Sequence, residues 1–194
     1  MQKEELRTRI RQTLSTISTG VRADLSECAS HNLLQQPIWH DSRAILAFLA
    51  FRDELDLFAA IEAAWTSGKT VALPRFVAEQ NRYAAAVTSP EKREFVKGAF
   101  GVLEPPADAP LIPLNRLDLV LVPGLAFDRR GRRLGRGKGF YDRLLAEVTG
   151  IKCGVALDEQ IVEELPEEPH DIAMNFILTP TRWIAVQSRP LTGS

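Results

Sequence analysis

The sequence predicts an α/β protein of three layers, α/β/α, in which helices cover both faces of a mostly parallel, Rossmann-like central sheet. Short continuous apolar runs, typical of strands buried on both faces, recur along the chain, as in AILAFLAF (44–51) and LDLVLVP (117–123). Segments with helical patterning separate these runs at the spacing of β-α-β units. The length favours a single domain over residues 1–194.

The N-terminal region is predicted to be helical. Apolar side chains recur there every three or four positions: Leu6, Ile10, Leu14 and Ile17. This spacing predicts an amphipathic helix over 3–18, and a second helix is expected over 23–36, ending before Pro37. Lys3 and Arg7 share another face of the first helix, which by itself indicates only a solvated surface.

A first β-α-β unit follows. The buried strand 44–51 leads directly into the acidic stretch RDELD (52–56), and a helix over 57–65 connects it to a second buried strand, TVALPRF (70–76). Because β-α-β connections join parallel strands, these two strands are expected to lie parallel in one sheet.

The rest of the chain is less regular before it returns to the same alternation. RYAAAV (82–87) is a possible strand, the stretch 91–106 is expected to be a helix or an ordered loop, and prolines after it mark a surface crossing. From residue 117 onward the predicted order is strand, glycine-rich loop, helix, strand and two closing strands: 117–123, 124–139, 140–148, 151–157, 176–180 and 183–186.

The composition and the N-terminal segment limit the classes of function to be considered. Lys and Arg total 24 and Asp and Glu total 25, for a net charge of −1, whereas dedicated nucleic-acid-binding proteins usually carry a basic excess. The N-terminus lacks the apolar core of a signal peptide, and no apolar run approaches the ~20 residues of a membrane span. Cys28 and Cys153 are far apart in sequence. We expect a cytoplasmic protein that binds neither membranes nor nucleic acid and is a monomer.

The stretch GRRLGRGKGFYDR (131–143) combines glycines with cationic side chains, which points to an anionic partner. It is not a P-loop, because Arg132 occupies the position of the first glycine and no Ser or Thr follows Lys138. A Rossmann fingerprint is also absent, because Phe140 stands where its third glycine is required.

The position of residues 131–143 in the chain favours a phosphate as the anionic partner. Alternate glycines let backbone N–H groups approach an anion, and the loop leads into the N-terminus of a predicted helix. Asp142, in the first turn, would balance the cations or hold a divalent metal. A solvated loop and a nucleic-acid-binding surface with stacking rings remain alternatives. Since ligands gather at the carboxyl ends of strands in such sheets, residues 52–56 and 124–139 are expected to converge.

PGLAFDRRGRRLGRGKGFYDR (123–143) closely resembles the signature of 5-formyltetrahydrofolate cyclo-ligases, roughly P-x-x-A-F-D-x-x-G-x-R-L-G-x-G-x-G-Y-Y-D, with Phe140 in place of its first Tyr. The resemblance extends to KEELR, RDELD, GKTVALPR (68–75) and ALDEQIVEELPEEPHDI (156–172), and covers nearly the whole chain. It implies an enzyme that uses ATP and Mg²⁺ to convert 5-formyltetrahydrofolate to 5,10-methenyltetrahydrofolate, ADP and phosphate, through a phosphorylated formyl (iminium phosphate) intermediate.

The resemblance also implies roles for individual residues. ATP contacts fall on Lys3, Arg7, Arg133, Leu134, Gly135, Arg136, Gly137, Lys138, Gly139, Phe140 and Tyr141. Substrate contacts fall on Leu49, Glu54, Gly135, Arg136, Gly137, Lys138 and Gly139. The resemblance implies that the catalytic residues are Arg136, Lys138 and Tyr141. Asp142 and Asp171 resemble the Mg²⁺ ligands, directly or through water.

One residue departs from the family pattern. Asn175 stands where many relatives carry Asp, and an amide supplies no charge, so we interpret it as a tolerated change, either beside the residues that contact the ligands or at the cap of a strand. Two other functions stay open at this point: a paralogue that binds nucleotide without cyclo-ligase activity, and an RNA-binding module.

Overall fold

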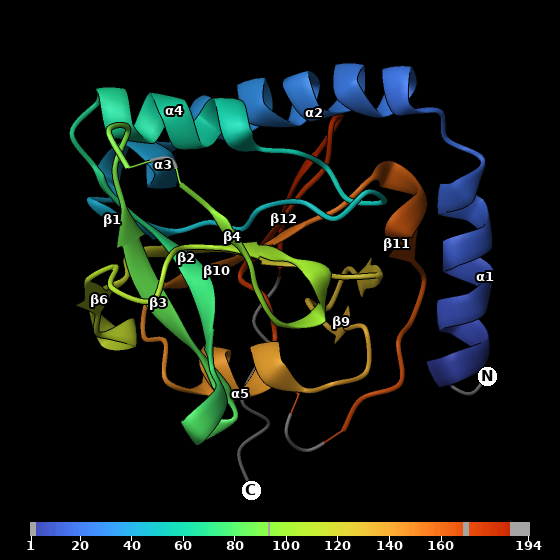
Figure 1. The fold of residues 1–194 in the computed structure, drawn as a ribbon. Helices are drawn as coiled ribbons and strands as arrows, with labels where there is room; N and C mark the ends of the chain where they lie inside the picture. The colour runs from blue at the N-terminus through green and yellow to red at the C-terminus, as the bar shows by residue number, and fades with distance from the viewer. Residues whose placement is uncertain (1–2, 93, 169–170, 187–194) are drawn as a thin grey trace, which may run out of the picture.

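The computed structural model describes residues 3–92, 94–168 and 171–186, and it places helices on both faces of a large sheet (Figure 1). The helices are α1 (Lys3–Ser15), α2 (Thr19–Leu34), α3 (Pro37–Asp41), α4 (Phe58–Thr66) and α5 (Phe140–Ala146). In Figure 1, α2 and α4 lie on one side of the sheet, α5 lies on the other, and α1 stands at one end. The three-layer α/β/α prediction is confirmed.

Eight strands within the described residues form the central sheet. In spatial order they are β13 (Trp183–Ala185), β12 (Phe176–Leu178), β10 (Ile151–Val155), β7 (Leu119–Pro123), β1 (Ala44–Leu46), β2 (Thr70–Val77), β3 (Arg82–Thr88) and β6 (Leu111–Ile112). The pairs from β12 through β10, β7 and β1 to β2 are parallel, while β13, β3 and β6 pair antiparallel at the two sides. The sheet is therefore mostly parallel, as predicted.

The direction of strand addition reverses between β1 and β7. From β1 the chain continues to β2 on one side, whereas β7, β10 and β12 add in sequence on the other. A crevice forms at the carboxyl ends of strands where the order reverses, which is where open α/β sheets bind ligands. The residues that follow β1 and β7 are thereby brought together.

The inner strands are buried because both faces of the sheet carry a hydrophobic core. On one face, Leu6 of α1, Leu33 of α2 and Ile61 of α4 belong to one buried cluster. On the other face, Leu144 and Leu145 of α5 pack in a second cluster. Continuous apolar runs such as 119–122 are the pattern expected for strands that face apolar layers on both sides.

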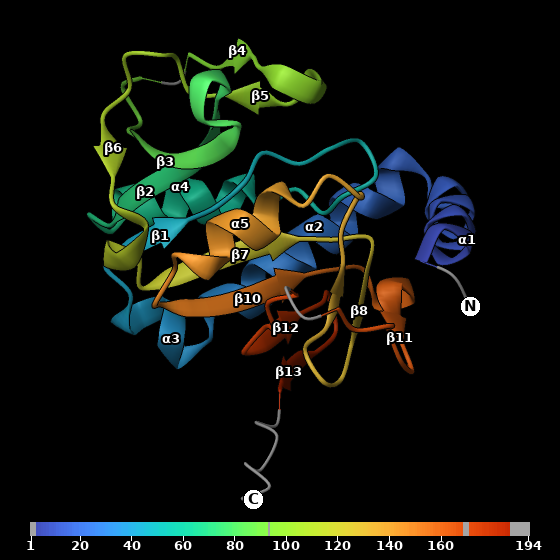
Figure 2. The same cartoon turned by 90° about the horizontal axis from the view of Figure 1, so that it is seen from below.

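Two local predictions were wrong. The predicted strand 44–51 pairs only over Ala44–Leu46, because the chain beyond Ala47 leaves the sheet to line the crevice. No element was predicted for Pro37–Asp41, which form the short helix α3. Within 91–106, the expected helix or loop contains a two-stranded hairpin of β4 (Val96–Lys97) and β5 (Leu103–Glu104). Figure 2 shows this hairpin at the edge of the molecule opposite β13.

The glycine-rich loop has more regular structure than the sequence predicts. It contains β8 (Ala126–Asp128) and β9 (Arg133–Leu134), which form a small sheet with β11 (Ile161–Val162). Short 3₁₀ turns complete the described chain: η1 (Ala78–Gln80), η2 (Ala99–Gly101), η3 (Leu114–Arg116) and η4 (Asp158–Gln160). Among the described residues, no helix combines the length and the apolar character needed to cross a bilayer.

Asp128 holds the base of this loop. Its fully buried carboxylate accepts hydrogen bonds from Arg132 Nε (2.6 Å), from the backbone N–H groups of Arg130 (2.9 Å) and Arg132 (3.1 Å), and from the N–H of Leu165 (2.9 Å). These bonds join the loop to the segment around β11. Arg132 therefore has a structural carboxylate partner.

Replacement of Asp128 by Ala should lower the free energy of unfolding by about 3 kcal/mol or more, because it leaves buried donors and a partly buried guanidinium without an acceptor. Urea denaturation measures this change, with Asp108→Ala at an exposed position as the matched control, expected to stay within about 0.5 kcal/mol of wild type. A loss below about 1 kcal/mol at Asp128 would contradict its structural role.

Candidate active site

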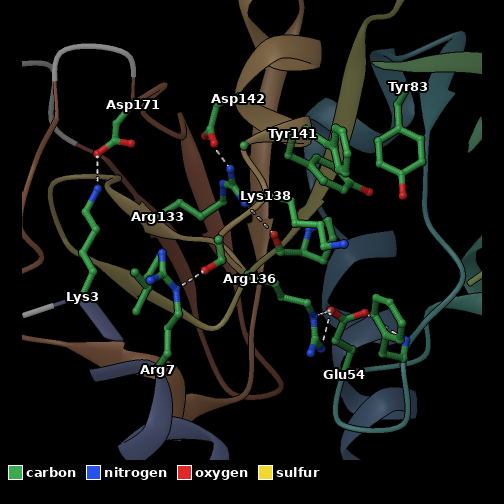
Figure 3. Close-up of a pocket in the computed structure, with 18 of the residues that line it drawn as sticks. Lys3, Arg7, Glu54, Tyr83, Arg133, Arg136, Lys138, Tyr141, Asp142 and Asp171 are labelled. Atoms are coloured by element: carbon green, nitrogen blue, oxygen red, sulfur yellow. Dashed lines mark hydrogen bonds and ion pairs between the residues drawn. The ribbon is translucent and has the colours of Figure 1, made fainter. Parts of the chain in front are cut away.

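A cavity of about 830 Å³ lies at the crevice between the ends of β1 and β7 (Figure 3). Its walls come from α1, the segment after β1, β3, the glycine-rich loop, the start of α5, and the residues Glu168 and Asp171. Every residue predicted to bind ATP, metal or folate lines this cavity except Leu49. Leu49 lines an adjoining recess that shares Phe51, Glu54 and Tyr141 with the cavity.

An ion pair joins the two segments that were predicted to converge. Arg136 Nη2 lies 3.0 Å from Glu54 Oε1 and 2.6 Å from Asp53 Oδ1. The second Glu54 oxygen, Oε2, accepts the backbone N–H of Phe51 at 2.9 Å, and the Phe51 ring lies 4.4 Å from the Arg136 guanidinium carbon. The predicted convergence of residues 52–56 with 124–139 is confirmed.

Burial and the charge of the partner shift the pKa values of Glu54 and Arg136 in opposite directions. Glu54 is only 8% exposed, and burial raises the pKa of its carboxyl above the usual range even though the Arg136 charge favours the ionised form. Burial disfavours the Arg136 cation, but the Glu54 and Asp53 carboxylates outweigh it and raise the pKa of the guanidinium. Arg136 therefore stays charged at the floor of the site.

The N-terminal helix closes the cavity by binding the loop. Arg7 Nε donates to the carbonyl oxygen of Gly135 at 3.0 Å, which fixes the end of α1 beside the glycines. Gly137 has φ +102° and Gly139 has φ +65°, both in the left-handed region, where a side chain is strained. The loop thus needs glycine at these positions to keep its path past Arg7.

Three further ion pairs line the cavity, and Figure 3 shows two of them, Arg133–Asp142 and Lys3–Asp171. Arg133 Nη2 lies 2.5 Å from Asp142 Oδ1, and Lys3 Nζ lies 3.2 Å from Asp171 Oδ2 and 3.2 Å from Glu168 Oε1. In this structure the carboxylates predicted to bind metal are partners of cations predicted to bind phosphate. Among the described residues, no group of three or more His, Cys, Asp or Glu side chains could hold a metal ion.

Aromatic residues form the wall on the other side from Lys3 and Asp171 (Figure 3). Tyr83 of β3 packs against Tyr141 with ring centroids 6.1 Å apart and against Phe140 at 5.6 Å. Burial raises the pKa of Tyr83 to about 12, with a further contribution from the Glu104 charge, and burial also raises the pKa of Tyr141. Both hydroxyls therefore remain protonated near neutral pH and can donate hydrogen bonds.

Two residues that line the cavity, Tyr83 and Phe51, were not predicted from the sequence. Tyr83 lies in an apolar run that indicated only a strand, and Phe51 lies at the end of one. Nothing in the residue pattern distinguished them from core residues. Asn175 lies outside the cavity lining: its side-chain oxygen accepts the backbone N–H of Lys152 at 2.8 Å, beside the start of β10. Of the two interpretations of Asn175, this contact agrees with strand capping.

The 5-formyltetrahydrofolate cyclo-ligase family model matches residues 1–180. The chain belongs to this family. It is 35% identical over 191 residues to the 5-formyltetrahydrofolate cyclo-ligase of Mycolicibacterium smegmatis, covering 94% of this chain and 95% of the relative. It is 33% identical over 177 residues to the Escherichia coli K12 cyclo-ligase, covering 89% and 97%.

Solved structures of cyclo-ligase relatives share the fold. The NMR structure of the Aquifex aeolicus 5,10-methenyltetrahydrofolate synthetase superposes with a TM-score of 0.86 at 33% identity and covers 100% of this chain and 97% of that one. A 5,10-methenyltetrahydrofolate synthetase from Mycoplasma pneumoniae, at 21% identity and a TM-score of 0.72, has the same fold and covers 93% of this chain and 99% of that one. The cyclo-ligase family thus extends over essentially the whole architecture described above.

Glu54→Gln should become more stable relative to wild type as the pH rises. The folded chain binds a proton at Glu54 more tightly than the unfolded chain does, so this group favours folding below its ordinary pKa of 4.5, and that contribution is lost as the pH rises through the higher folded-state pKa. Urea denaturation between about pH 4.5 and 8 measures the difference.

The same substitution at the exposed Glu5 is the control for removing one carboxylate. If the stability of Glu54→Gln falls relative to wild type over this range, the raised pKa of Glu54 is contradicted.

Proposed function

We propose that this chain converts 5-formyltetrahydrofolate and ATP to 5,10-methenyltetrahydrofolate, ADP and phosphate. The observation that carries the proposal is the single cavity of about 830 Å³ with a cationic, glycine-lined wall on one side and a tyrosine wall over a buried carboxylate on the other. A phosphoryl transfer to a folate needs both environments next to each other. The names of the relatives support the same reaction.

The cationic wall suits the triphosphate of ATP. Lys3 and Arg7 approach from α1, and Arg133, Arg136 and Lys138 approach from the loop, so cations from two directions surround one space. Gly135, Gly137 and Gly139 carry no side chain, which lets backbone N–H groups come close to phosphate oxygens. Bound phosphates would take over Lys3 and Arg133 from their present carboxylate partners.

The tyrosine wall suits the reduced folate. Its planar ring would lie against Tyr83 and Tyr141, with Phe51 and Leu49 supplying apolar contacts and Glu54 supplying an acceptor at the floor. Because Arg136 is bound to Glu54, the same residue faces both substrates. We assign it to the junction where the formyl group meets the phosphate.

The chemistry needs alignment more than activation by a strong base. A formyl oxygen on an amide nitrogen is a weak nucleophile, so positioning it in line with the γ-phosphorus and neutralising the phosphate charge lower the barrier. Its attack forms a C–O–P linkage and expels ADP. Arg136 and Lys138 would stabilise the charge that develops on the transferred phosphoryl group, and the neutral Tyr141 hydroxyl would donate a hydrogen bond beside it.

Ring closure completes the reaction. N10 of the folate attacks the activated formyl carbon and loses its proton, and the C–O bond then breaks so that phosphate leaves with the former formyl oxygen. A desolvated site favours this step, because water would otherwise compete for the activated carbon. The buried floor at Glu54 and the tyrosine wall provide that exclusion.

Asp142 and Asp171 fit a magnesium ion bound with the nucleotide. Mg²⁺ in phosphate-transferring sites is usually held by one or two carboxylates together with phosphate oxygens, so a cage of several protein ligands is not required. Each carboxylate uses one oxygen, Oδ1 of Asp142 and Oδ2 of Asp171, in its ion pair. When bound, the ion would neutralise charge on the phosphates.

The other expectations from the sequence, that the protein is cytoplasmic, is a monomer and does not bind nucleic acid, stay predictions.

The purified protein should produce methenyltetrahydrofolate, detected by its absorbance, only when ATP, Mg²⁺ and 5-formyltetrahydrofolate are all present. Asp142→Ala should lower kcat about 100-fold or more, because it removes a metal ligand and the partner of Arg133. Asp24→Ala, at an exposed position, is the matched control and should keep wild-type activity.

Thermal unfolding of both variants checks that the fold survives. Absence of product beside an active control enzyme would contradict the proposed reaction. Retained Mg²⁺-dependent turnover in a folded Asp142→Ala protein would remove the metal role of Asp142.

A further inference from the structure

Glu104 is a buried carboxylate that has no part in the mechanism above. It ends β5, is 4% exposed, and lines the recess of about 50 Å³ that adjoins the main cavity. The recess and the cavity have these lining residues in common: Phe51, Glu54, Tyr83, Val102, Pro123 and Tyr141. Glu104 therefore lines a space that adjoins the proposed folate side of the cavity.

One oxygen of this carboxylate lacks a hydrogen bond. Oε2 accepts the backbone N–H of Phe76 at 2.9 Å, whereas Oε1 has no partner among the described residues. An unsatisfied buried acceptor is costly, and few occur in native proteins without a reason. In the described part of the chain, the other buried side-chain atoms of this kind are Ser30 Oγ and Arg133 Nε. Glu104 supplies the one unsatisfied carboxylate oxygen of the three.

The surrounding backbone is shaped to hold this group. A Cβ at Gly98, in the same hairpin, would overlap the carboxyl group of Glu104, so the glycine leaves the space that the carboxylate fills. The nearby cation does not neutralise it directly, because Arg75 Nη1 donates to the carbonyl oxygens of Pro106, Ala107 and Ala109. Burial raises the pKa of Glu104, which is the expected effect on an under-solvated carboxyl.

Glu54 differs from Glu104 in the hydrogen bonding of its carboxylate oxygens. Both oxygens of Glu54 are engaged, Oε1 by Arg136 and Oε2 by the N–H of Phe51. Glu104 Oε1 therefore remains available for a ligand that brings its own N–H donors into an apolar recess. A planar ring with an amino group at its edge has this chemistry, and the pteridine ring of a reduced folate carries the 2-amino group beside N3–H.

We propose that Glu104 is a substrate-binding residue whose free oxygen accepts hydrogen bonds from the 2-amino and N3–H edge of the pteridine ring. The inference rests on the proposed function. The amino edge lies at the opposite end of the bicyclic ring from the C6 side chain, so anchoring it at Glu104 directs the N5 formyl group and C6 back toward Arg136 and the loop. Tyr83 and Tyr141, which line both spaces, would flank the ring.

Equilibrium binding of two ligands tests this assignment: 5-formyltetrahydrofolate and its analogue with a 2-methyl group in place of the 2-amino group. Wild type should bind the analogue about tenfold to a hundredfold more weakly, because the analogue leaves a buried carboxylate unpaired. In Glu104→Gln that ratio should fall to about threefold or less, through weaker binding of the natural ligand. The wild-type comparison needs no variant to fold.

Controls separate a binding role from a structural one. Glu79→Gln, at an exposed position, should keep both the affinity and the ratio, and Glu54→Gln should keep the ratio. The unliganded Glu104→Gln protein should melt at or above the wild-type temperature, because it no longer holds an under-satisfied buried carboxylate. A residue with only a structural role would instead lower Tm and leave the ligand ratio unchanged.

An unchanged ratio in folded Glu104→Gln, or equal wild-type affinity for the two ligands, would overturn the inference. If wild type neither binds the natural ligand nor forms methenyltetrahydrofolate, the proposed function itself fails. Turnover by wild type with an unchanged ratio in the variant contradicts the role of Glu104 alone.

Discussion

The ion pair between Arg136 and Glu54 organises the site. Its members follow two strands that are neighbours only because the sheet changes direction between β1 and β7. The pair holds the cationic loop against the floor of the crevice, and the Phe51 ring covers it. Because Glu54 is buried, separation from Arg136 would leave its carboxylate without a compensating charge, and this keeps the loop against the floor of the crevice. The cationic loop and the aromatic wall can line one cavity only while these two segments stay joined.

The sequence predicted the parts of the fold that have a strong, repeated pattern. The apolar run 117–123 became β7, and the periodic residues of the first helix became the buried face of α1. Predictions failed where the pattern was short or where the chain served the site. Residues 47–51 are as apolar as a buried strand, yet they leave the sheet after Leu46 and line the cavity and its recess instead. The β4–β5 hairpin is too short to show an alternation, and its pairing depends on contacts with β2 that no local pattern records.

The candidate site was predictable where chemistry is concentrated in one segment. Glycines and cations between Gly131 and Gly139 predicted an anion-binding loop, and the resemblance to cyclo-ligases supplied its partners. The sequence could not assign the individual cations, since Arg132 and Arg136 have the same side chain, but Asp128 holds one outside the cavity and Glu54 holds the other inside it. Tyr83 and Glu104 were missed because the roles proposed for them follow from burial against strands distant in sequence. A glutamate in an irregular stretch gives no local sign that one of its oxygens will lack a partner.

The central claim is that one cavity aligns the formyl oxygen of the folate with the γ-phosphorus of ATP. Turnover of 5-formyltetrahydrofolate carrying ¹⁸O in the formyl group tests it most directly, with mass spectrometry of the phosphate released. If the formyl oxygen attacks phosphorus and the C–O bond then breaks, the phosphate should carry the label. Unlabelled phosphate, with the ¹⁸O recovered in water, would show that ATP is hydrolysed separately and would contradict the account.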